Sequence, residues 1–304
     1  MNKVTLLDGG MGQELLRRSE RAITRMWSAD IMFNEPAIVT ELHRDFILSG
    51  ASVITLNNYS ATPHRLAREN ELDKLKPLHT LAMQAAADAI EQAQREGIRV
   101  AGCLPPLVAS YKPEITLTYA ESLSSYRELV ELQSPGCDLF ICETMASISE
   151  ATAACNAALE SGKPVWVALT VSDTNFGQLR SGEAVSEAVA ILEALGADAI
   201  LFNCSQPEAI NGAWPQIQNS TLPIGAYANG FVSIAALHPG GTVEVLETRE
   251  DLDPEQYANY VMQWVNNGAT IVGGCCEIGP GHIKAIYERL LQQGLLFAPQ
   301  TKQP

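Results

Sequence analysis

The segment TIVGGCC, residues 270–276, joins a short apolar run to two glycines and two adjacent cysteines. The apolar run is typical of a buried β-strand, and a glycine pair is a common place for such a strand to end. Adjacent cysteines at a strand end have three explanations: a bond between the two thiols, two small buried side chains, or two ligands of one metal ion. The choice depends on what the rest of the chain places beside them.

Seven further runs resemble the strand predicted at 270–274. They lie at 4–8, 52–57, 98–103, 138–143, 164–171, 198–203 and 222–227, and segments with helical signals separate them. The runs are nearly continuously apolar, which is typical of parallel strands covered on both faces. Eight such strands alternating with helices predict an α/β fold, a single (β/α)8 TIM barrel, with residues 1–304 forming one domain.

A doubly wound sheet is the structural alternative. Its dinucleotide-binding fingerprint is incomplete, because Gly10-Met11-Gly12 supplies two glycines but Leu15 stands where the third belongs. The incomplete fingerprint favours the barrel.

Two helices have clear predicted boundaries. Asp253 and Pro254 have the residue types of an N-cap and a first helical position, and Gly268 is the expected stop of that helix. A second helix is expected over 77–96, with Gly97 as its stop.

Composition excludes several classes of function. The formal net charge of −15 opposes binding to nucleic acid or to an anionic membrane surface. The longest charge-free stretch, 223–243, is interrupted by Pro239 and four glycines, so no membrane-spanning helix is expected. The apolar N-terminal run is too short for a secretory signal. We therefore expect a cytoplasmic location in which the seven cysteines are thiols by default, and a disulfide between Cys275 and Cys276 is unlikely there.

Polar residues gather where the predicted strands end. In a TIM barrel the active site lies at the carboxyl ends of the strands. The residues there are Asp8, Gly9 and Gly10 after the first strand, Asn57, Asn58 and Tyr59 after the second, Glu143 and Thr144 after the fourth, Asn203 and Cys204 after the sixth, Tyr227, Ala228 and Asn229 after the seventh, and Cys275 and Cys276 after the eighth.

Three of these residues are predicted to share one ion. Alternate strands contribute to the same layer of a barrel, so the sulfurs of Cys204, Cys275 and Cys276 are expected to converge. Three thiolates without a fourth protein ligand are typical of a catalytic zinc site with one open position. A structural zinc site needs a fourth Cys or His, and His282 is the candidate for it.

The motifs at these positions resemble a known family. DGGMGQEL at 8–15, CET at 142–144, FNCS at 202–205 and GGCC at 273–276 are similar to motifs of the homocysteine S-methyltransferases. The resemblance covers the chain from Asp8 to about Leu291. It implies a Zn²⁺-containing barrel whose ligands are Cys204, Cys275 and Cys276. It also implies that the small-molecule substrates are homocysteine and a methyl donor, and that the product is methionine.

The resemblance also implies a binding site for the amino-acid end of homocysteine. Asp8 and Glu143 stand at the positions that contact its ammonium group, and the backbone of Gly9 and Gly10 lies at the same end. Asn57 is a further substrate-binding candidate. Each of these residues also has a structural alternative: Asp8 as a turn or cap residue, Glu143 as the partner of an arginine, and Asn57 as a backbone hydrogen-bond partner.

The methyl donor is left open. S-methylmethionine is the first choice, and S-adenosylmethionine, betaine, dimethylsulfoniopropionate and a methyl-corrinoid protein are alternatives, as is a protein that binds zinc and homocysteine without turnover. A cationic donor suits an acidic site with an aromatic face from Trp27, Tyr59 or Tyr111. Leu56, Asn58 and the segments at 205–209 and 227–230 depart from common family residues, so they are where donor preference is expected to differ.

Overall fold

Eight parallel strands form a nearly closed barrel. The computed structural model describes residues 3–21, 24–238, 241 and 243–296. Neighbouring strands pair in the order β1-β8-β7-β6-β5-β4-β3-β2, and a parallel bridge between Leu7 and Val53 brings the first strand to the second. The strands are β1 (Thr5–Leu6), β2 (Val53–Thr55), β3 (Arg99–Leu104), β4 (Leu139–Met145), β5 (Val165–Leu169), β6 (Ala199–Asn203), β7 (Ile224–Tyr227) and β8 (Ile271–Val272).

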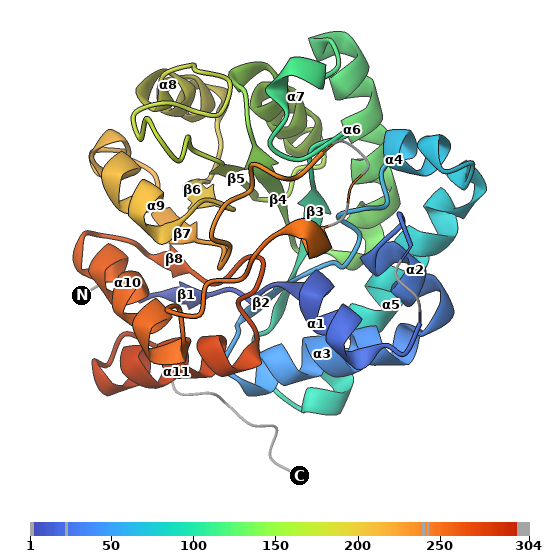
Figure 1. The fold of residues 1–304 in the computed structure, drawn as a ribbon, viewed down its shortest axis with the longest axis horizontal. Coiled ribbons are helices and arrows are strands. Elements are labelled where there is room, and N and C mark those ends of the chain that lie inside the picture. Colours follow the sequence, from blue (N-terminus) through green and yellow to red (C-terminus); the bar gives the residue numbers. More distant parts are fainter. Residues whose placement is uncertain (1–2, 22–23, 239–240, 242, 297–304) are drawn as a thin grey trace.

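Helices surround this barrel (Figure 1). They are α1 (Met11–Arg18), α2 (Ser28–Asn34), α3 (Pro36–Leu48), α4 (Pro63–Arg68), α5 (Leu75–Ala93), α6 (Tyr119–Gln133), α7 (Ile148–Leu159), α8 (Val185–Leu195), α9 (Pro207–Ala213), α10 (Pro254–Asn266) and α11 (Pro280–Gln292). Short 3₁₀ turns lie at Leu72–Lys74, Pro113–Ile115, Ser134–Gly136, Trp214–Gln216 and Val243–Val245. The TIM barrel predicted from the sequence is therefore confirmed. None of the described helices is both long and apolar enough to cross a membrane.

Side chains alternate between two apolar layers. Leu7, Val53, Ile141, Leu201 and Ile271 belong to a buried cluster that fills the barrel interior. The residues next to them in sequence, such as Leu6 and Ile54, pack in the larger cluster between strands and helices. Because successive strand residues point to opposite faces, strands buried on both sides read as continuous apolar runs, as the sequence shows.

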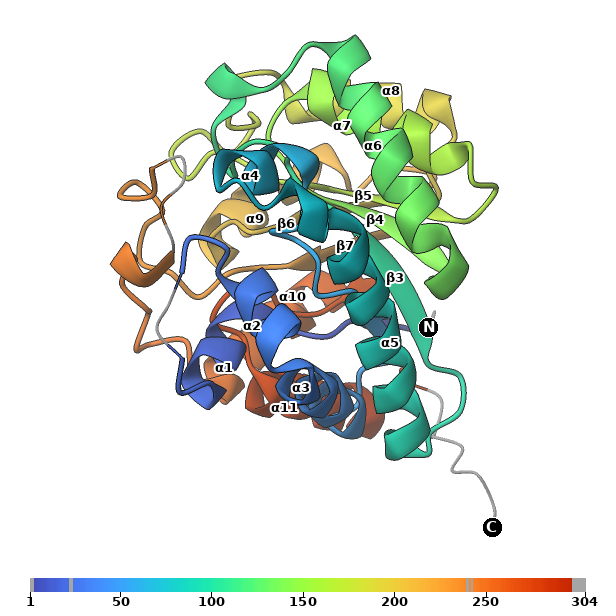
Figure 2. The ribbon, with the colours of Figure 1, turned by 90° about the vertical axis from the view of Figure 1, so that its right-hand side faces the viewer.

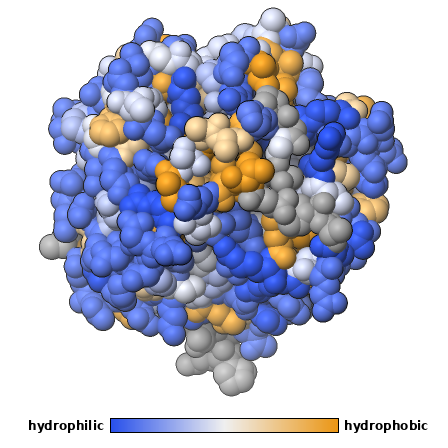
Figure 3. Space-filling model, viewed as in Figure 1, coloured by the Kyte–Doolittle hydropathy of each residue, from blue (hydrophilic) through white to orange (hydrophobic). Residues whose placement is uncertain are grey.

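Strand ends at one rim of the barrel carry the site. All eight predicted strands are present, but β1, β2, β5, β6, β7 and β8 are shorter than predicted. Strands β1 and β8 keep only two residues each, and the chain has left the regular ladder at Asp8 and Gly273. The long segment between β7 and α10 extends from this rim. Figure 2 shows its orange ribbon at the left of the barrel, opposite the side on which N is marked. Figure 3 shows hydrophobic surface near the middle of the face seen in Figure 1. Val232 and Val245, in the segment between β7 and α10, are exposed apolar residues.

The two helix predictions have different outcomes. Asp253 caps α10 as expected, because its side chain accepts a hydrogen bond from the Gln256 N–H. The prediction of a helix over 77–96 is wrong at its end. Helix α5 stops at Ala93, and Gln94 forms its left-handed C-cap (φ 51°), whereas Gly97, the predicted stop, lies beyond the helix with its own positive φ (75°).

Tyr257 of α10 joins the ends of two strands. Its hydroxyl accepts a hydrogen bond from the Ala228 N–H at 3.0 Å and donates one to the Gly273 carbonyl at 2.8 Å. Both backbone groups are buried, and they lie just after β7 and β8. A single buried side chain therefore fixes the two strand ends relative to each other.

Replacing Tyr257 with Phe is expected to lower the free energy of unfolding by ~1–3 kcal/mol, because it leaves the buried Ala228 N–H without a partner. Denaturant unfolding measures the loss. Tyr260→Phe is the matched control, since the Tyr260 hydroxyl donates to Glu208 at the half-buried surface of the same helix. Equal losses in the two variants would contradict the proposed linking role of Tyr257.

Candidate active site

The three cysteines predicted to converge do so. Cys204 follows β6, and Cys275 and Cys276 follow β8, yet their three sulfur atoms all lie within 4.8 Å of one another. Cys204 is buried and the other two are half-buried. Among the residues that the structure describes, this is the single group of three or more potential ligands placed closely enough to hold a metal ion.

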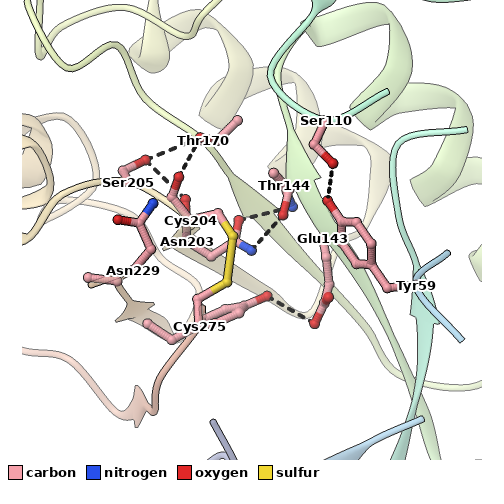
Figure 4. Close-up of a disulfide and its surroundings, with 12 residues drawn as sticks. Tyr59, Ser110, Glu143, Thr144, Thr170, Asn203, Cys204, Ser205, Asn229 and Cys275 are labelled. Carbon is pink, nitrogen blue, oxygen red and sulfur yellow. Dashed lines mark hydrogen bonds between the residues drawn. A yellow bond between two sulfur atoms is a disulfide. The ribbon is translucent and has the colours of Figure 1, made fainter. Parts of the chain in front are cut away.

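Two of these cysteines form a disulfide. Cys204 and Cys275 are bonded, with Cα atoms 5.8 Å apart, whereas Cys276 carries a free thiol (Figure 4). The expectation of seven free thiols is therefore wrong for this pair. The reason is geometric: a convergence that suits a metal ion also brings two sulfurs within bonding reach. Adjacent Cys275 and Cys276 are not bonded to each other, as expected, and Cys103, Cys137, Cys142 and Cys155 are free and buried.

Glycines and one strained turn produce this convergence. Cys204 has a left-handed backbone (φ 47°) directly after β6, which turns its sulfur toward the end of β8. A Cβ atom on Gly273 would lie 2.5 Å from the Cβ of Leu7, and one on Gly10 would lie 2.5 Å from the Cys275 carbonyl oxygen. The ends of β1 and β8 can therefore approach each other only because both residues lack a side chain.

His282 is not a fourth ligand. Its Nδ1 accepts a hydrogen bond from the Gly279 N–H at 3.2 Å, and its Nε2 lies 3.0 Å from the Leu252 carbonyl oxygen. Both ring nitrogens are thus used at the start of α11. The three sulfurs consequently have no fourth protein ligand beside them in the described residues, which fits an open position rather than a closed structural site.

One cavity collects every residue predicted for the site. Its lining includes Asp8, Gly9, Gly10, Asn57, Glu143, Cys204, Cys275 and Cys276. Trp27, Tyr59 and Tyr111, the candidate aromatic residues for a donor, line the same cavity. The Nδ2 group of Asn57 is buried and has no hydrogen-bond partner among the described residues, so it is free to donate to a ligand.

Asp8 is a buried acid and Glu143 a half-buried one, and neither has a basic partner among the described residues. Asp8 accepts hydrogen bonds from the Thr55 N–H at 2.8 Å and the Thr55 hydroxyl at 3.3 Å. Glu143 accepts from the Tyr227 hydroxyl at 3.4 Å and the Cys103 thiol at 3.6 Å. No ion pair involves either acid in the described part of the chain, so the alternative of a Glu143–arginine pair is not supported.

Burial dominates the acidity of these carboxyl groups. Desolvation raises the pKa of Asp8 to about 8, the hydrogen bonds from Thr55 oppose this rise, and the nearby Glu143 adds to it. Desolvation likewise raises the pKa of Glu143 to about 7, against the hydrogen bonds from Cys103 and Tyr227. A ligand ammonium group would stabilise the ionised forms that the protein alone disfavours. The carboxyl groups of Asp8 and Glu143 can therefore bind a cationic group together.

Several neighbours of these residues have structural roles. Asn203 accepts a hydrogen bond from the Thr144 N–H at 2.9 Å and donates to its hydroxyl at 3.0 Å, which orients the residue after Glu143. Asn58 lies 2.8 Å from a ring nitrogen of His79, and Asn229 accepts from the Phe231 N–H at 3.2 Å. These amides therefore stabilise the loops around the cavity.

The structure adds three residues that we had not assigned to the site. Tyr227 and Cys103 contact Glu143; the strand-end pattern had marked Tyr227 without giving it a role, and Cys103 stands at the end of the third predicted strand, where the same pattern could have found it. Arg65 also lines the cavity, but it comes from α4, and no periodicity or strand end marks it in the sequence.

Comparison with known proteins gives one consistent family. A sequence profile described as homocysteine S-methyltransferase matches residues 5–290. The homocysteine S-methyltransferase of Escherichia coli K12 is 29% identical over 310 residues, with 94% of this chain and 95% of that protein aligned. Homocysteine S-methyltransferase 4 of Zea mays is 28% identical, with 92% of this chain and 87% of that protein aligned.

Solved structures agree with the sequence comparison. The homocysteine methyltransferase MmuM from E. coli in its metallated form has a TM-score of 0.79 and 25% identity, with 95% of this chain and 96% of that chain covered. The oxidized form of the same enzyme also has a TM-score of 0.79 and 25% identity, with 94% of this chain and 96% of that chain covered. The similarity thus extends over nearly the whole of both chains.

Ionisation of Asp8 is expected to make the metal-free protein less stable as the pH rises. The carboxyl titrates near 3.8 when unfolded and near 8 when folded, so the folded chain holds the extra proton in between. The free energy of unfolding should therefore fall across pH 4 to 8, by up to ~1.4 kcal/mol per pH unit, relative to Asp8→Asn. Denaturant unfolding at several pH values measures this difference. Parallel pH profiles for the two proteins would contradict the assignment.

Proposed function

The chain belongs to the homocysteine S-methyltransferase family, and we propose that it transfers a methyl group from S-methylmethionine to the sulfur of homocysteine, forming methionine with a bound Zn²⁺. The observation that carries this proposal is the placement of three cysteine sulfurs and of the carboxyl groups of Asp8 and Glu143, which have no basic partner among the described residues, around one cavity. Homocysteine has a thiol at one end and an ammonium group at the other, so it matches both features. Residues 1–304 act as one catalytic domain in this proposal.

The donor set fits zinc. Cys204, Cys275 and Cys276 would hold the ion as thiolates, and sulfur ligands favour Zn²⁺ over the hard cations that prefer oxygen. When bound, Zn²⁺ lowers the pKa of a thiol that occupies its open position, which otherwise titrates at about 8.5. The Cys204–Cys275 disulfide has to be reduced first, because a disulfide supplies no thiolate. This requirement suits a reducing, cytoplasmic compartment.

The buried polar residues would orient homocysteine. Asp8 and Glu143 would bind its ammonium group, which stabilises both carboxylates and relieves the cost of their burial. The unpaired Nδ2 of Asn57 would donate to its carboxylate, and the backbone of Gly9 and Gly10 would form the floor of the same end. The substrate would then be held at both ends, with its sulfur beside the cysteines.

The transfer step is a displacement at carbon. The homocysteine thiolate forms a new bond to the methyl carbon, and the bond from that carbon to the donor sulfonium breaks. The electron pair of the broken bond stays on the donor sulfur, which leaves as a neutral thioether. The acidic cavity and the indole face of Trp27 favour a positively charged donor. S-adenosylmethionine, betaine and dimethylsulfoniopropionate share that charge and are the alternatives to test, together with a methyl-corrinoid protein.

Replacing Cys275 with Ala is expected to abolish stoichiometric zinc binding and to lower methionine formation by at least ~100-fold, since one ligand is lost. The assay supplies homocysteine and S-methylmethionine to reduced, zinc-loaded protein, and a chelator should abolish activity of the wild type. Cys137→Ala is the control, because Cys137 is a free cysteine remote from the cluster and should keep both zinc and activity.

Two outcomes would count against the proposal. Full activity in a zinc-free Cys275→Ala variant would refute the role of the metal. A wild type that binds zinc and homocysteine, yet makes methionine from none of the donors, would instead indicate a binding protein without turnover.

A further inference from the structure

Arg65 is held on the cavity wall in a defined orientation. It belongs to α4, and its Nη2 donates to the Pro106 carbonyl at 2.9 Å and to the Ser110 hydroxyl at 3.3 Å. The guanidinium carbon lies 5.3 Å from the centre of the Tyr59 ring, and the Tyr59 hydroxyl lies 2.8 Å from Ser110. Figure 4 shows Tyr59 and Ser110 meeting above β3 and β4 near Glu143. The Pro106 carbonyl, the Ser110 hydroxyl and the Tyr59 ring therefore fix the orientation of the guanidinium.

This guanidinium has no carboxylate partner. No described acid lies within ion-pair distance of Arg65, and its buried Nε has no hydrogen-bond partner among the described residues. The other arginines that line the cavity differ, since Arg25 and Arg68 are exposed and Arg68 pairs with Glu69. Desolvation accordingly lowers the pKa of Arg65. A partly buried cation without a counter-ion is costly, so an anionic ligand would be favoured there.

The carboxyl group whose charge acts on Arg65 is already engaged by other groups. Glu150 acts on Arg65 from a distance, but its Oε1 accepts hydrogen bonds from the Leu107 N–H at 3.3 Å and the Tyr126 hydroxyl at 3.4 Å. Desolvation raises the pKa of Glu150 to about 7, so it is a weak counter-ion near neutral pH. Arg65 thus remains a partly buried cation of the cavity without a counter-ion among the described residues.

We propose that Arg65 binds the carboxylate of the methyl donor and thereby selects donors that carry a carboxylate as well as a methylated onium centre. This proposal rests on the proposed methyl transfer. Homocysteine already has groups for both its charges, with Asp8 and Glu143 for the ammonium and Asn57 for the carboxylate. The Nη1 group of Arg65 has no hydrogen bond among the described residues, so it can donate charge-assisted hydrogen bonds to a carboxylate, while stacking on Tyr59 orients the guanidinium.

The test compares two donors that differ by one group. S-methylmethionine carries the carboxylate, and (3-aminopropyl)dimethylsulfonium is its decarboxylated counterpart. In Arg65→Met the KM for S-methylmethionine should rise by roughly 30-fold or more, because a desolvated charge pair is lost. The KM for homocysteine should stay unchanged, and the decarboxylated donor should be used equally well by both proteins.

Controls separate this role from folding and from net charge. Arg65→Lys keeps the charge but loses the planar guanidinium that Tyr59 and Ser110 orient, so it should fall between the wild type and Arg65→Met, and it replaces that variant if Arg65→Met does not fold. Arg127→Met removes an exposed arginine that pairs with Glu160 on the outer helices, and it should leave the KM for both substrates unchanged.

Three results would overturn the proposal: an unchanged KM for S-methylmethionine, an equal loss with the decarboxylated donor, or a rise in the KM for homocysteine instead. If the wild type transfers no methyl group from any donor, the proposed function fails separately. Calorimetric titration of S-methylmethionine in the presence of homocysteine then decides the role of Arg65. Weaker binding to Arg65→Met would support it, and equal affinity for the two proteins would overturn it.

Discussion

The close approach of β1, β6 and β8 at their carboxyl ends is the constraint on which the site depends. Three sulfurs from two distant parts of the sequence lie within 4.8 Å of one another only because the chain is folded tightly at that rim. The absence of side chains at Gly10 and Gly273 permits this approach, and the left-handed turn at Cys204 aims its sulfur toward β8. Tyr257 then ties the ends of β7 and β8 together from outside the barrel.

The cavity collects charges that the protein does not neutralise by itself. Asp8 and Glu143 line the cavity without a basic partner, and Arg65 lines it without an acidic one, among the residues that the structure describes. Removing such a charge from water without a partner raises the free energy of the ligand-free protein. A ligand group of opposite charge offsets this cost, so binding is favoured. An amino-acid substrate and a zwitterionic methyl donor carry the ammonium and carboxylate groups that would complete this arrangement.

Much of the site could be predicted from the sequence because it follows one geometric rule. Parallel barrel strands end at the same rim, so residues at strand ends meet, and Asp8, Glu143 and the three cysteines were found in this way. The end of α5 was not predictable in the same manner, since Gln94 adopts the left-handed turn although a glycine follows three residues later.

Contacts between distant elements account for the other features that sequence patterns missed. Arg65 comes from a six-residue helix, and only the packing of α4 against the loop after β3 places its guanidinium on the cavity wall. His282 was a reasonable candidate ligand by residue type, but tertiary structure commits both of its nitrogens to α11 and Leu252. The proximity of Cys204 and Cys275 was predicted from the strand ends, but the bond between their two sulfurs was not.

The most direct test of the central claim is zinc-edge X-ray absorption of the reduced, zinc-loaded protein, recorded with and without homocysteine. The account predicts three sulfur neighbours at about 2.3 Å in the free protein and four when homocysteine is bound. An unchanged sulfur count on saturation with homocysteine would contradict activation of the substrate thiol by the metal.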